Sequence, residues 1–299
     1  MKKIKIPEVS VVIPVYNGEK YIKDAVNSVL NQTFKDFEII IVNDASTDNT
    51  EKVIFDNFKK LIEIGKIHYL KNNKNKGRNI SGNIGAKKAK GKYLFFLDAD
   101  DLWKNYHIER NLDILQKENA DIVFARPRIF IDEKGNIKRV SKSKIERDID
   151  KIIFSSKIGF PSATAFNKSS FLFYNPEFKF REDIELFIRA RLKNQKIRIS
   201  DTNSVLIREH NSKTRMSKTH HFYEYTLKLY DFYKDKIPPM YLPYFIMHVA
   251  DVAFKFGDFK TGYKMMFNAV KKRPSILLDR RILLNFIKRG FRIDRAFLS

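Results

Sequence analysis

Short β-branched runs alternate with helix-length segments over the first hundred residues, and this alternation restricts the fold more than any other feature. Residues 9–15 form an apolar run typical of a strand buried on both faces. Residues 21–30 carry apolar side chains at helical spacing, and further strands are predicted at 37–42, 67–70 and 93–97. Strands joined by helix-length crossovers form right-handed βαβ units. The sequence therefore predicts an α/β fold in which helices flank a mainly parallel sheet.

The second half of the chain differs in character from the first. Residues 121–210 mix further strands with a helix at 184–192, whereas helices rich in Tyr, Phe, Leu and Lys predominate from about residue 219. We expect an α/β domain over residues 1–215 and a basic helical C-terminal region over residues 216–299. The length of 299 residues is ample for a buried core, and the absence of cysteine excludes a disulfide scaffold, thiolate zinc sites and a cysteine nucleophile.

The formal net charge of +23, from 58 Lys and Arg against 35 Asp and Glu, indicates an anionic partner. Nucleic acid, a lipid surface and a phosphorylated substrate all fit that charge. No run of about 18 uncharged apolar residues is present, so we expect no membrane-spanning helix. Residues 1–7 are basic but lack the apolar stretch of a signal peptide, and we therefore expect a cytoplasmic protein.

Residues at the carboxyl ends of the strands are the candidate site, because ligands of open parallel sheets bind there. Tyr16 follows the first predicted strand, Asp44 follows the second, and the acidic segment 98–101 follows the fourth. A tyrosine ring can stack on a planar base, and a lone carboxylate can accept a hydrogen bond from a base N–H. For Asp44 the alternative is a turn and helix cap formed together with Ser46.

The acidic segment 98–101 carries three carboxylates within four residues. Such groups repel one another unless a cation lies among them. In extended geometry Asp98 and Asp100 point toward a hard divalent cation, which prefers oxygen ligands and bridges phosphates. The metal would neutralise a diphosphate leaving group and act as a Lewis acid. The pattern favours a functional cluster over a structural one.

Five ordered motifs resemble an inverting family 2 glycosyltransferase of the GT-A fold. They occupy residues 11–17, 28–33, 38–48, 83–85 and 91–101. The resemblance is firm over about the first third of the chain and slight after residue 215. It implies a GT-A α/β domain with a C-terminal helical appendage.

The resemblance implies a site for a nucleotide-diphospho-sugar donor. Pro14, Val15 and Tyr16 would frame the base, and Asp44 would accept a hydrogen bond from its imide. Asp98 would lie near the ribose and the metal, and Asp100 would ligate Mn²⁺ or Mg²⁺. The other residues that the resemblance implies for donor binding are Gly77, Arg78, Asn83, Ala99 and Glu182. Gly82 departs from the family pattern, because many relatives carry Arg there, and phosphate contacts at that position are in doubt.

The acceptor side of the site is expected in the second half of the chain. Transfer with inversion needs a carboxylate that removes the acceptor proton. The resemblance assigns that base to Asp183, with Glu182 beside it; the alternative is that both acids only favour a helix N-terminus. His210 lies in a segment similar to the family's Arg-X-His motif and is expected to reach the metal or the diphosphate, although a lone histidine is more often structural.

The resemblance implies sugar transfer to an acceptor hydroxyl in cell-surface glycan, polysaccharide or glycolipid biosynthesis, with a UDP-sugar as the expected donor and a glycan or lipid-linked acceptor. Trp103 is the only tryptophan, so the Gln-X-X-Arg-Trp motif of processive synthases is absent and one or few additions are expected. The alternatives are a sugar-nucleotide pyrophosphorylase and a non-enzymatic module that binds nucleic acid or membrane. Acidic strand ends would repel a nucleic acid, so no nucleic-acid partner is expected.

The C-terminal residues 271–299 hold nine Lys or Arg and two Asp. As a helix they would carry an apolar stripe of Ile282, Leu283, Phe286 and Ile287. The cations expected on roughly the opposite side are Arg281, Lys288, Arg292 and Arg295. Such a helix suits an anionic surface at the inner face of the cell membrane, and the alternative is a helix packed on the domain with its charges in water. Lys213, Arg215 and Lys218 are expected either to close over the phosphates or to remain solvated.

Overall fold

The computed structural model describes residues 6–142, 146, 148–210 and 219–291, which form two compact units. The first unit comprises residues 1–145 and 159–211, and the second comprises 146–158 and 212–299. The expected boundary at residue 215 and the basic residues Lys213, Arg215 and Lys218 lie outside the described residues. Residues 146–158 were expected in the first domain but belong to the second unit. The reason is that helix α5 (Ile149–Phe154) packs against α8 (Leu242–Phe256).

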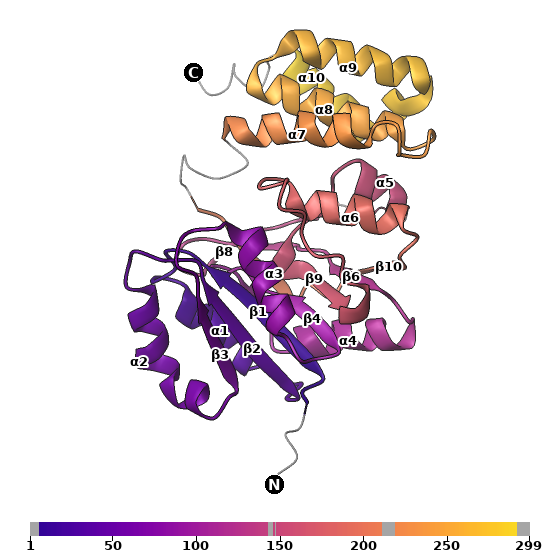
Figure 1. Cartoon of the computed structure of the whole chain (residues 1–299). Helices are drawn as coiled ribbons and strands as arrows, with labels where there is room; N and C mark the ends of the chain where they lie inside the picture. Colours follow the sequence, from indigo (N-terminus) through magenta and orange to yellow (C-terminus); the bar gives the residue numbers. More distant parts are fainter. Residues whose placement is uncertain (1–5, 143–145, 147, 211–218, 292–299) are drawn as a thin grey trace. The chain divides into compact units, whose positions relative to one another are not determined.

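A seven-stranded sheet in the order β10-β6-β9-β4-β1-β2-β3 forms the centre of the first unit (Figure 1). The strands are β1 (Val9–Val15), β2 (Phe37–Asn43), β3 (Ile67–Lys71), β4 (Tyr93–Phe96), β6 (Ile122–Ala125), β9 (Thr164–Asn167) and β10 (Ile197–Ser200). Neighbours pair in parallel except at β9, which is antiparallel to both β4 and β6. The predicted mainly parallel sheet is confirmed, and the side chains of β1 and β2 are buried throughout.

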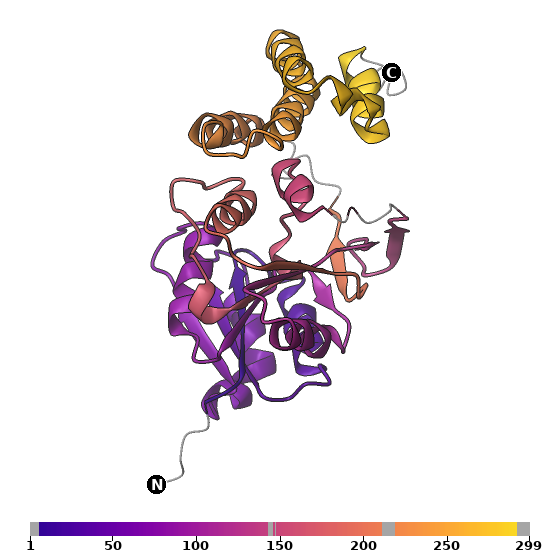
Figure 2. The same ribbon diagram turned by 90° about the vertical axis from the view of Figure 1, so that its right-hand side faces the viewer.

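Helices flank this sheet, as predicted (Figures 1 and 2). They are α1 (Ile22–Leu30), α2 (Thr50–Glu63), α3 (Arg78–Lys88), α4 (His107–Lys117) and α6 (Glu182–Leu192). α3 packs against β1 and β2, whereas α4 packs against β6, β9 and β10. In α1 the residues buried at helical spacing are Ile22, Ala25, Val26 and Val29. The crossover helices thus cover the sheet with the faces that the apolar periodicity predicts.

Gly91 precedes β4 at a point where two backbone segments almost touch. Its N–H donates to Ser10 Oγ at 2.8 Å, and a Cβ at this position would lie 2.6 Å from the backbone nitrogen of Ser10. Only a glycine fits there, because the obstructing atom belongs to β1 rather than to a movable side chain.

We predict that Gly91→Ala lowers the free energy of unfolding by about 1–3 kcal/mol, the usual cost of overpacking. Urea denaturation followed by circular dichroism measures the change. Lys90→Ala is the matched control, since the Lys90 residue is exposed. Equal unfolding midpoints for the two variants would contradict this prediction, because they would show that the backbone at Ser10 can move to accommodate the added methyl group.

A second sheet of four strands, in the order β5-β11-β7-β8, supports the segment that follows β4. Its strands are β5 (Leu102–Trp103), β7 (Ile129–Ile131), β8 (Ile137–Val140) and β11 (Val205–Arg208). β5 continues directly from the acidic segment 98–101 and pairs antiparallel with β11. The end of β11, with Arg208 and nearby His210, is therefore held beside that acidic segment.

The second unit is built from helices in its described residues (Figure 1). Besides α5 and α8 they are α7 (His220–Tyr233), α9 (Phe259–Lys272), the 3₁₀ helix η4 (Pro274–Leu278) and α10 (Arg280–Gly290). Aromatic and aliphatic side chains of α8, α9 and η4 form its core, with Ile246, Ala250 and Ala269 fully buried. Among the described residues, no helix combines the length and hydrophobicity needed to cross a bilayer.

The apolar stripe predicted on the last helix divides in the structure. Ile282 and Phe286 pack against the core of the second unit, whereas Leu283 and Ile287 are exposed to solvent. The prediction placed all four on one face, because it grouped neighbouring positions without knowing which side meets α8. Arg292 and Arg295, predicted on the opposite side, lie outside the described residues.

Candidate active site

The carboxyl ends of β1, β2 and β4 meet at one edge of the main sheet. Val15 pairs with Asn43 in the parallel register, so Tyr16 and Asp44 follow side by side. The N–H of Leu97 donates to the carbonyl of Val12, which extends β4 toward the same edge. Tyr16 is half exposed, whereas Pro14 and Val15 are buried in β1. The predicted strand-end residues therefore share one rim.

Asp44 is buried, and its carboxylate is occupied by the loop that leads into α3. The backbone N–H groups of Lys76 and Gly77 donate to its two oxygens at 2.9 and 2.8 Å, and Asn72 Nδ2 donates at 2.7 Å. Asp44 thus fixes the loop, with Gly77 in the left-handed region at φ 90°. The alternative cap with Ser46 does not account for this carboxylate, because the Ser46 N–H donates to Asn43 Oδ1 instead. The contact of Asp44 with a base stays a prediction.

Arg78, the first residue of α3, connects the two halves of the site. Its Nε lies 2.6 Å from Asp98 Oδ1, and its Nη1 lies 3.5 Å from Glu182 Oε1. The guanidinium stands over the ring of Tyr174, 5.5 Å from its centroid, and its Nη2 is buried without a hydrogen-bond partner. The positively charged guanidinium of Arg78 therefore links Asp98, which follows β4, to Glu182 at the start of α6.

The ring of Tyr174 also explains the glycine at position 82. A Cβ on Gly82 would lie 3.3 Å from that ring. Asn83 holds the Tyr174 backbone in place through two hydrogen bonds of 2.8 Å, one donated by Asn83 Nδ2 and one accepted by Asn83 Oδ1. Asn83, predicted beside the nucleotide, thus positions the loop that supports Arg78.

Asp100 pairs with His210. Asp100 Oδ2 and His210 Nε2 are 2.7 Å apart, and both side chains are partly exposed. Arg208 fixes the arrangement: its Nε donates to the Asp100 carbonyl at 2.8 Å, and its guanidinium stands 4.7 Å from the centroid of the Tyr21 ring. Tyr21 in turn contacts the His210 ring, with centroids 5.3 Å apart.

Asp101 is the buried member of the acidic segment. Ser162 Oγ donates to one of its oxygens at 2.6 Å, and the Arg208 N–H donates to the other at 2.8 Å. Burial, followed by the nearby Asp100 and Asp98, raises the pKa of Asp101 well above its usual range. Asp101 therefore anchors the segment, whereas the side chains of Asp98 and Asp100, on either side of Ala99, are partly exposed.

Glu182 and Asp183 form the first turn of α6, after Arg181 in the left-handed conformation at φ 67°. Asp183 Oδ1 accepts from the N–H of Ile184 at 2.7 Å. Burial and then the Asp183 charge raise the pKa of Glu182 to about 7, and burial also raises the pKa of Asp183. A carboxylate with a raised pKa is a stronger base, as removal of an acceptor proton requires.

The raised pKa of Glu182 predicts a pH-dependent stability. An unfolded glutamate loses its proton near 4.5, but Glu182 holds it to about 7, so the folded state binds more protons between these values. Stability should fall as pH rises through this window, and Glu182→Gln should flatten the slope and raise the unfolding midpoint at pH 8.

Urea midpoints at several pH values test this, with exposed Glu63→Gln on α2 as the control. Identical slopes in wild type and Glu182→Gln would contradict it.

The structure also shows residues that the sequence prediction missed. Arg208 lies in the segment that resembles Arg-X-His but was given no role, although the arginine of that motif was a signal visible in the sequence. Ser162 and Tyr174 lie in the stretch between residues 125 and 180, where no sequence pattern indicated them. Their contacts with Asp101 and Arg78 depend on loop packing alone.

The predicted metal ligands separate into two groups. Asp98 faces Arg78, and Asp100 faces His210. Within the described residues, no three His, Cys, Asp or Glu side chains gather as a metal-binding group. The Asp100–His210 pair nevertheless fits Mn²⁺ or Mg²⁺, because these ions in nucleotide sites take one or two protein ligands and complete their coordination with phosphate oxygens and water.

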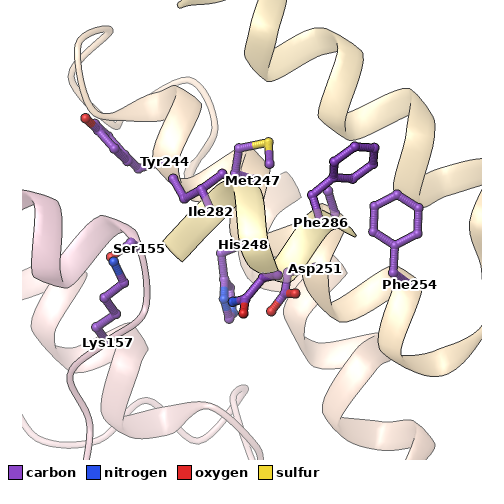
Figure 3. Close-up of a pocket in the computed structure, with 11 residues that line it drawn as sticks. Ser155, Lys157, Tyr244, Met247, His248, Asp251, Phe254, Ile282 and Phe286 are labelled. Atoms are coloured by element: carbon purple, nitrogen blue, oxygen red, sulfur yellow. The ribbon is translucent and has the colours of Figure 1, made fainter. Parts of the chain in front are cut away.

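A small pocket in the second unit shares no residue with this site (Figure 3). Tyr244, Met247 and Phe254 of α8 line it together with Ile282 and Phe286 of α10. Lys157, after α5, is among its polar residues, and burial lowers the pKa of this lysine. The pocket therefore lies at the packing interface between α8 and α10.

Residues 10–175 match the model of glycosyl transferase family 2. The match spans more than half of the chain, and the chain therefore belongs to this family. The predicted family and the predicted enzyme class, a glycosyltransferase, are confirmed.

Relatives with similar sequences are themselves glycosyltransferases. An uncharacterized glycosyltransferase of Rickettsia conorii is 41% identical over 150 residues, 49% of this chain and 24% of that protein. TuaG of Bacillus subtilis, whose name assigns it to teichuronic acid biosynthesis, is 37% identical over 40% of this chain and 46% of its own length. The chain spans from about a quarter to a half of the length of curated relatives that it matches.

Solved structures with low sequence identity share the fold. The S. aureus TarS fragment 1–349 superposes with a TM-score of 0.60 at 19% identity, covering 89% of this chain and 79% of that one. The Pyrobaculum calidifontis mannosyltransferase PcManGT, in complex with GDP-Man and Mn²⁺, gives a TM-score of 0.56 at 14% identity, covering 96% and 88%. TarS has also been solved with UDP-GlcNAc.

Proposed function

We propose that the protein transfers a sugar from a nucleotide-diphospho-sugar, in the first place a UDP-sugar, to an acceptor hydroxyl, with inversion and without processivity. The observation that carries the proposal is the Arg78 bridge. It joins Asp98 at the donor-side strand end to Glu182 beside Asp183. Donor-side and acceptor-side carboxylates thus belong to one site, as direct transfer between two bound substrates requires.

The donor is proposed to bind along the strand-end rim. The ring of Tyr16, half exposed after β1, stacks on the base, and the loop fixed by Asp44 passes beside it. The free Nη2 of Arg78 donates to an oxygen of the donor. The UDP and UDP-GlcNAc complexes of TarS support a uridine nucleotide, whereas the GDP-Man complex of PcManGT keeps guanosine open.

Asp100 and His210 are the residues proposed to hold Mn²⁺ or Mg²⁺. Such an ion supplies Lewis-acid charge to the diphosphate leaving group. The chain's contribution is orientation. Arg208 donates to the Asp100 carbonyl and contacts the ring of Tyr21. The Tyr21 ring in turn packs on His210. The side chains of Asp100 and His210, which would bind the metal, are thereby held in a fixed orientation.

Asp183 is proposed as the general base. As the acceptor oxygen forms its bond to the anomeric carbon, the bond from that carbon to the diphosphate breaks, and the hydroxyl proton passes to the Asp183 carboxylate. Attack on the face opposite the leaving group inverts the anomeric configuration. Glu182 remains paired with Arg78 and holds the site together beside the base.

The alternatives differ in what they leave unexplained. A pyrophosphorylase has no need of the Glu182–Asp183 carboxylates, and family membership favours transfer. A non-enzymatic basic module does not explain the acidic rim. The proposed acceptor is a cell-surface polysaccharide or a lipid-linked glycan, reached from the cytoplasmic side of the membrane. The name of TuaG, which assigns it to teichuronic acid biosynthesis, supports the polysaccharide.

Release of nucleoside diphosphate from UDP-, GDP- and dTDP-sugars with Mn²⁺ tests the proposal, because water can replace the acceptor hydroxyl as the attacking group. We expect release from one nucleotide class, and proton NMR of the first-formed sugar should show the inverted anomer. Release from none of the donors, or a retained anomer, would contradict the proposal.

A further inference from the structure

Among the described residues of the second unit, helix α10 packs through the face that carries Ile282 and Phe286. Ile282 and Phe286 point toward α8, where they line the pocket of Figure 3. An ion pair between Arg289 and Asp251 and a hydrogen bond of 3.0 Å from Tyr263 Oη to the Gly290 carbonyl secure the same face. At its start Asp279 caps the helix and pairs with Lys151 at 2.9 Å. The helix is therefore firmly held.

The outer face of α10, defined here as Leu283, Leu284, Ile287 and Phe291, is apolar and exposed. Leu284 is 44% exposed and Phe291 63% exposed. Leu278, just before the helix, is 85% exposed. These side chains are exposed although the opposite face of α10 is well packed. Their exposure is therefore not the result of a poorly packed helix. A cluster of exposed apolar side chains of this kind marks an interaction site.

Positively charged side chains lie on the same helix as the outer face. Arg280, Arg281 and Lys288 are exposed on the same helix, and residues 280–291 contain no acidic residue. The face is thus apolar and positive at once, in contrast to the acidic rim of the active site. A second copy of the chain is a poor occupant, since a two-fold contact would bring these cations against their own counterparts.

We propose that the outer face of α10 docks the protein on an anionic lipid surface. Apolar side chains enter the boundary between headgroups and acyl chains, and Arg280, Arg281 and Lys288 contact the phosphates. A duplex nucleic acid would satisfy the cations but give the leucines no apolar partner. Docking places the enzyme at the surface where a lipid-linked acceptor resides, and that consequence rests on the proposed function, whereas docking itself does not.

Flotation of the chain of residues 1–299 with vesicles tests the proposal. We expect wild type to float with equimolar phosphatidylcholine and phosphatidylglycerol, and to stay at the bottom with phosphatidylcholine alone. The double variant Leu284→Glu with Ile287→Glu should bind at least about tenfold more weakly, and Arg281→Glu with Lys288→Glu should lose binding in the same way. Ile64→Glu, at a 75% exposed position after α2, is the matched control and should float like wild type.

Circular dichroism and donor binding of each variant show that the fold is retained, since none of these residues lies in the active site. The proposal is overturned if wild type ignores anionic vesicles, or if the Leu284→Glu, Ile287→Glu variant floats as wild type does. It is also overturned if this variant instead abolishes self-association measured by sedimentation. Vesicle binding needs no donor or acceptor, so its failure leaves the proposed transfer chemistry intact.

Discussion

Asp183→Asn is expected to lower kcat by about 10²–10⁴-fold, the range that a positioned general base contributes. Asparagine keeps the shape of the side chain and can still accept from the N–H of Ile184, so α6 should begin as before. The substitution removes only the group that takes the acceptor proton. Donor affinity should therefore remain close to that of wild type.

Steady-state release of nucleoside diphosphate gives kcat, and calorimetry gives donor affinity. Asp113→Asn is the matched control, because Asp113 is a half-exposed residue of α4 paired with Lys117. Normal turnover in Asp183→Asn would assign the base elsewhere, with Glu182 the next candidate. A parallel loss of donor affinity would show instead that Asp183 binds the donor.

Asp100→Ala is expected to weaken donor binding in Mn²⁺ by about tenfold or more, because it removes one of the two residues proposed to hold the ion that would contact the diphosphate. The substitution removes the carboxylate of the Asp100–His210 pair, so that His210 is the one proposed metal ligand left of that pair. The backbone of the segment should hold, since Asp101 remains anchored by Ser162 and Arg208.

Titrations with and without Mn²⁺ separate the metal from direct contacts. In Asp100→Ala the two affinities should converge, whereas Asp56→Ala, on the surface of α2, should keep the wild-type difference. A variant that loses affinity equally with and without metal would show that Asp100 contacts the donor directly. An unchanged metal dependence would move the proposed metal site away from this pair.

The strand-end positions could be predicted from the sequence because they depend on local patterns. Buried β-branched runs define the strands, and parallel pairing brings their ends together, so Tyr16, Asp44 and the acidic segment 98–101 were found. What each carboxylate contacts could not be predicted. Asp44 binds the amides of the loop at Lys76 and Gly77, and that loop has no periodic pattern.

Long-range side-chain contacts explain the rest of the difference. Arg78 reaches Glu182 across 104 residues of sequence, and Ser162 reaches Asp101 across 61. Such contacts follow from how loops pack on a finished sheet. The same holds for α10: periodicity predicted a helix, but the position of α8 determines that Ile282 and Phe286 are the packed residues.

Calorimetric titration of the wild-type protein with UDP, GDP and dTDP, each with and without Mn²⁺, tests metal-dependent donor binding at the strand-end rim most directly. We predict that one nucleoside diphosphate, in the first place UDP, binds with Mn²⁺ at least about tenfold more tightly than without it. Metal-independent binding of all three, or no binding of any, would contradict the proposed site.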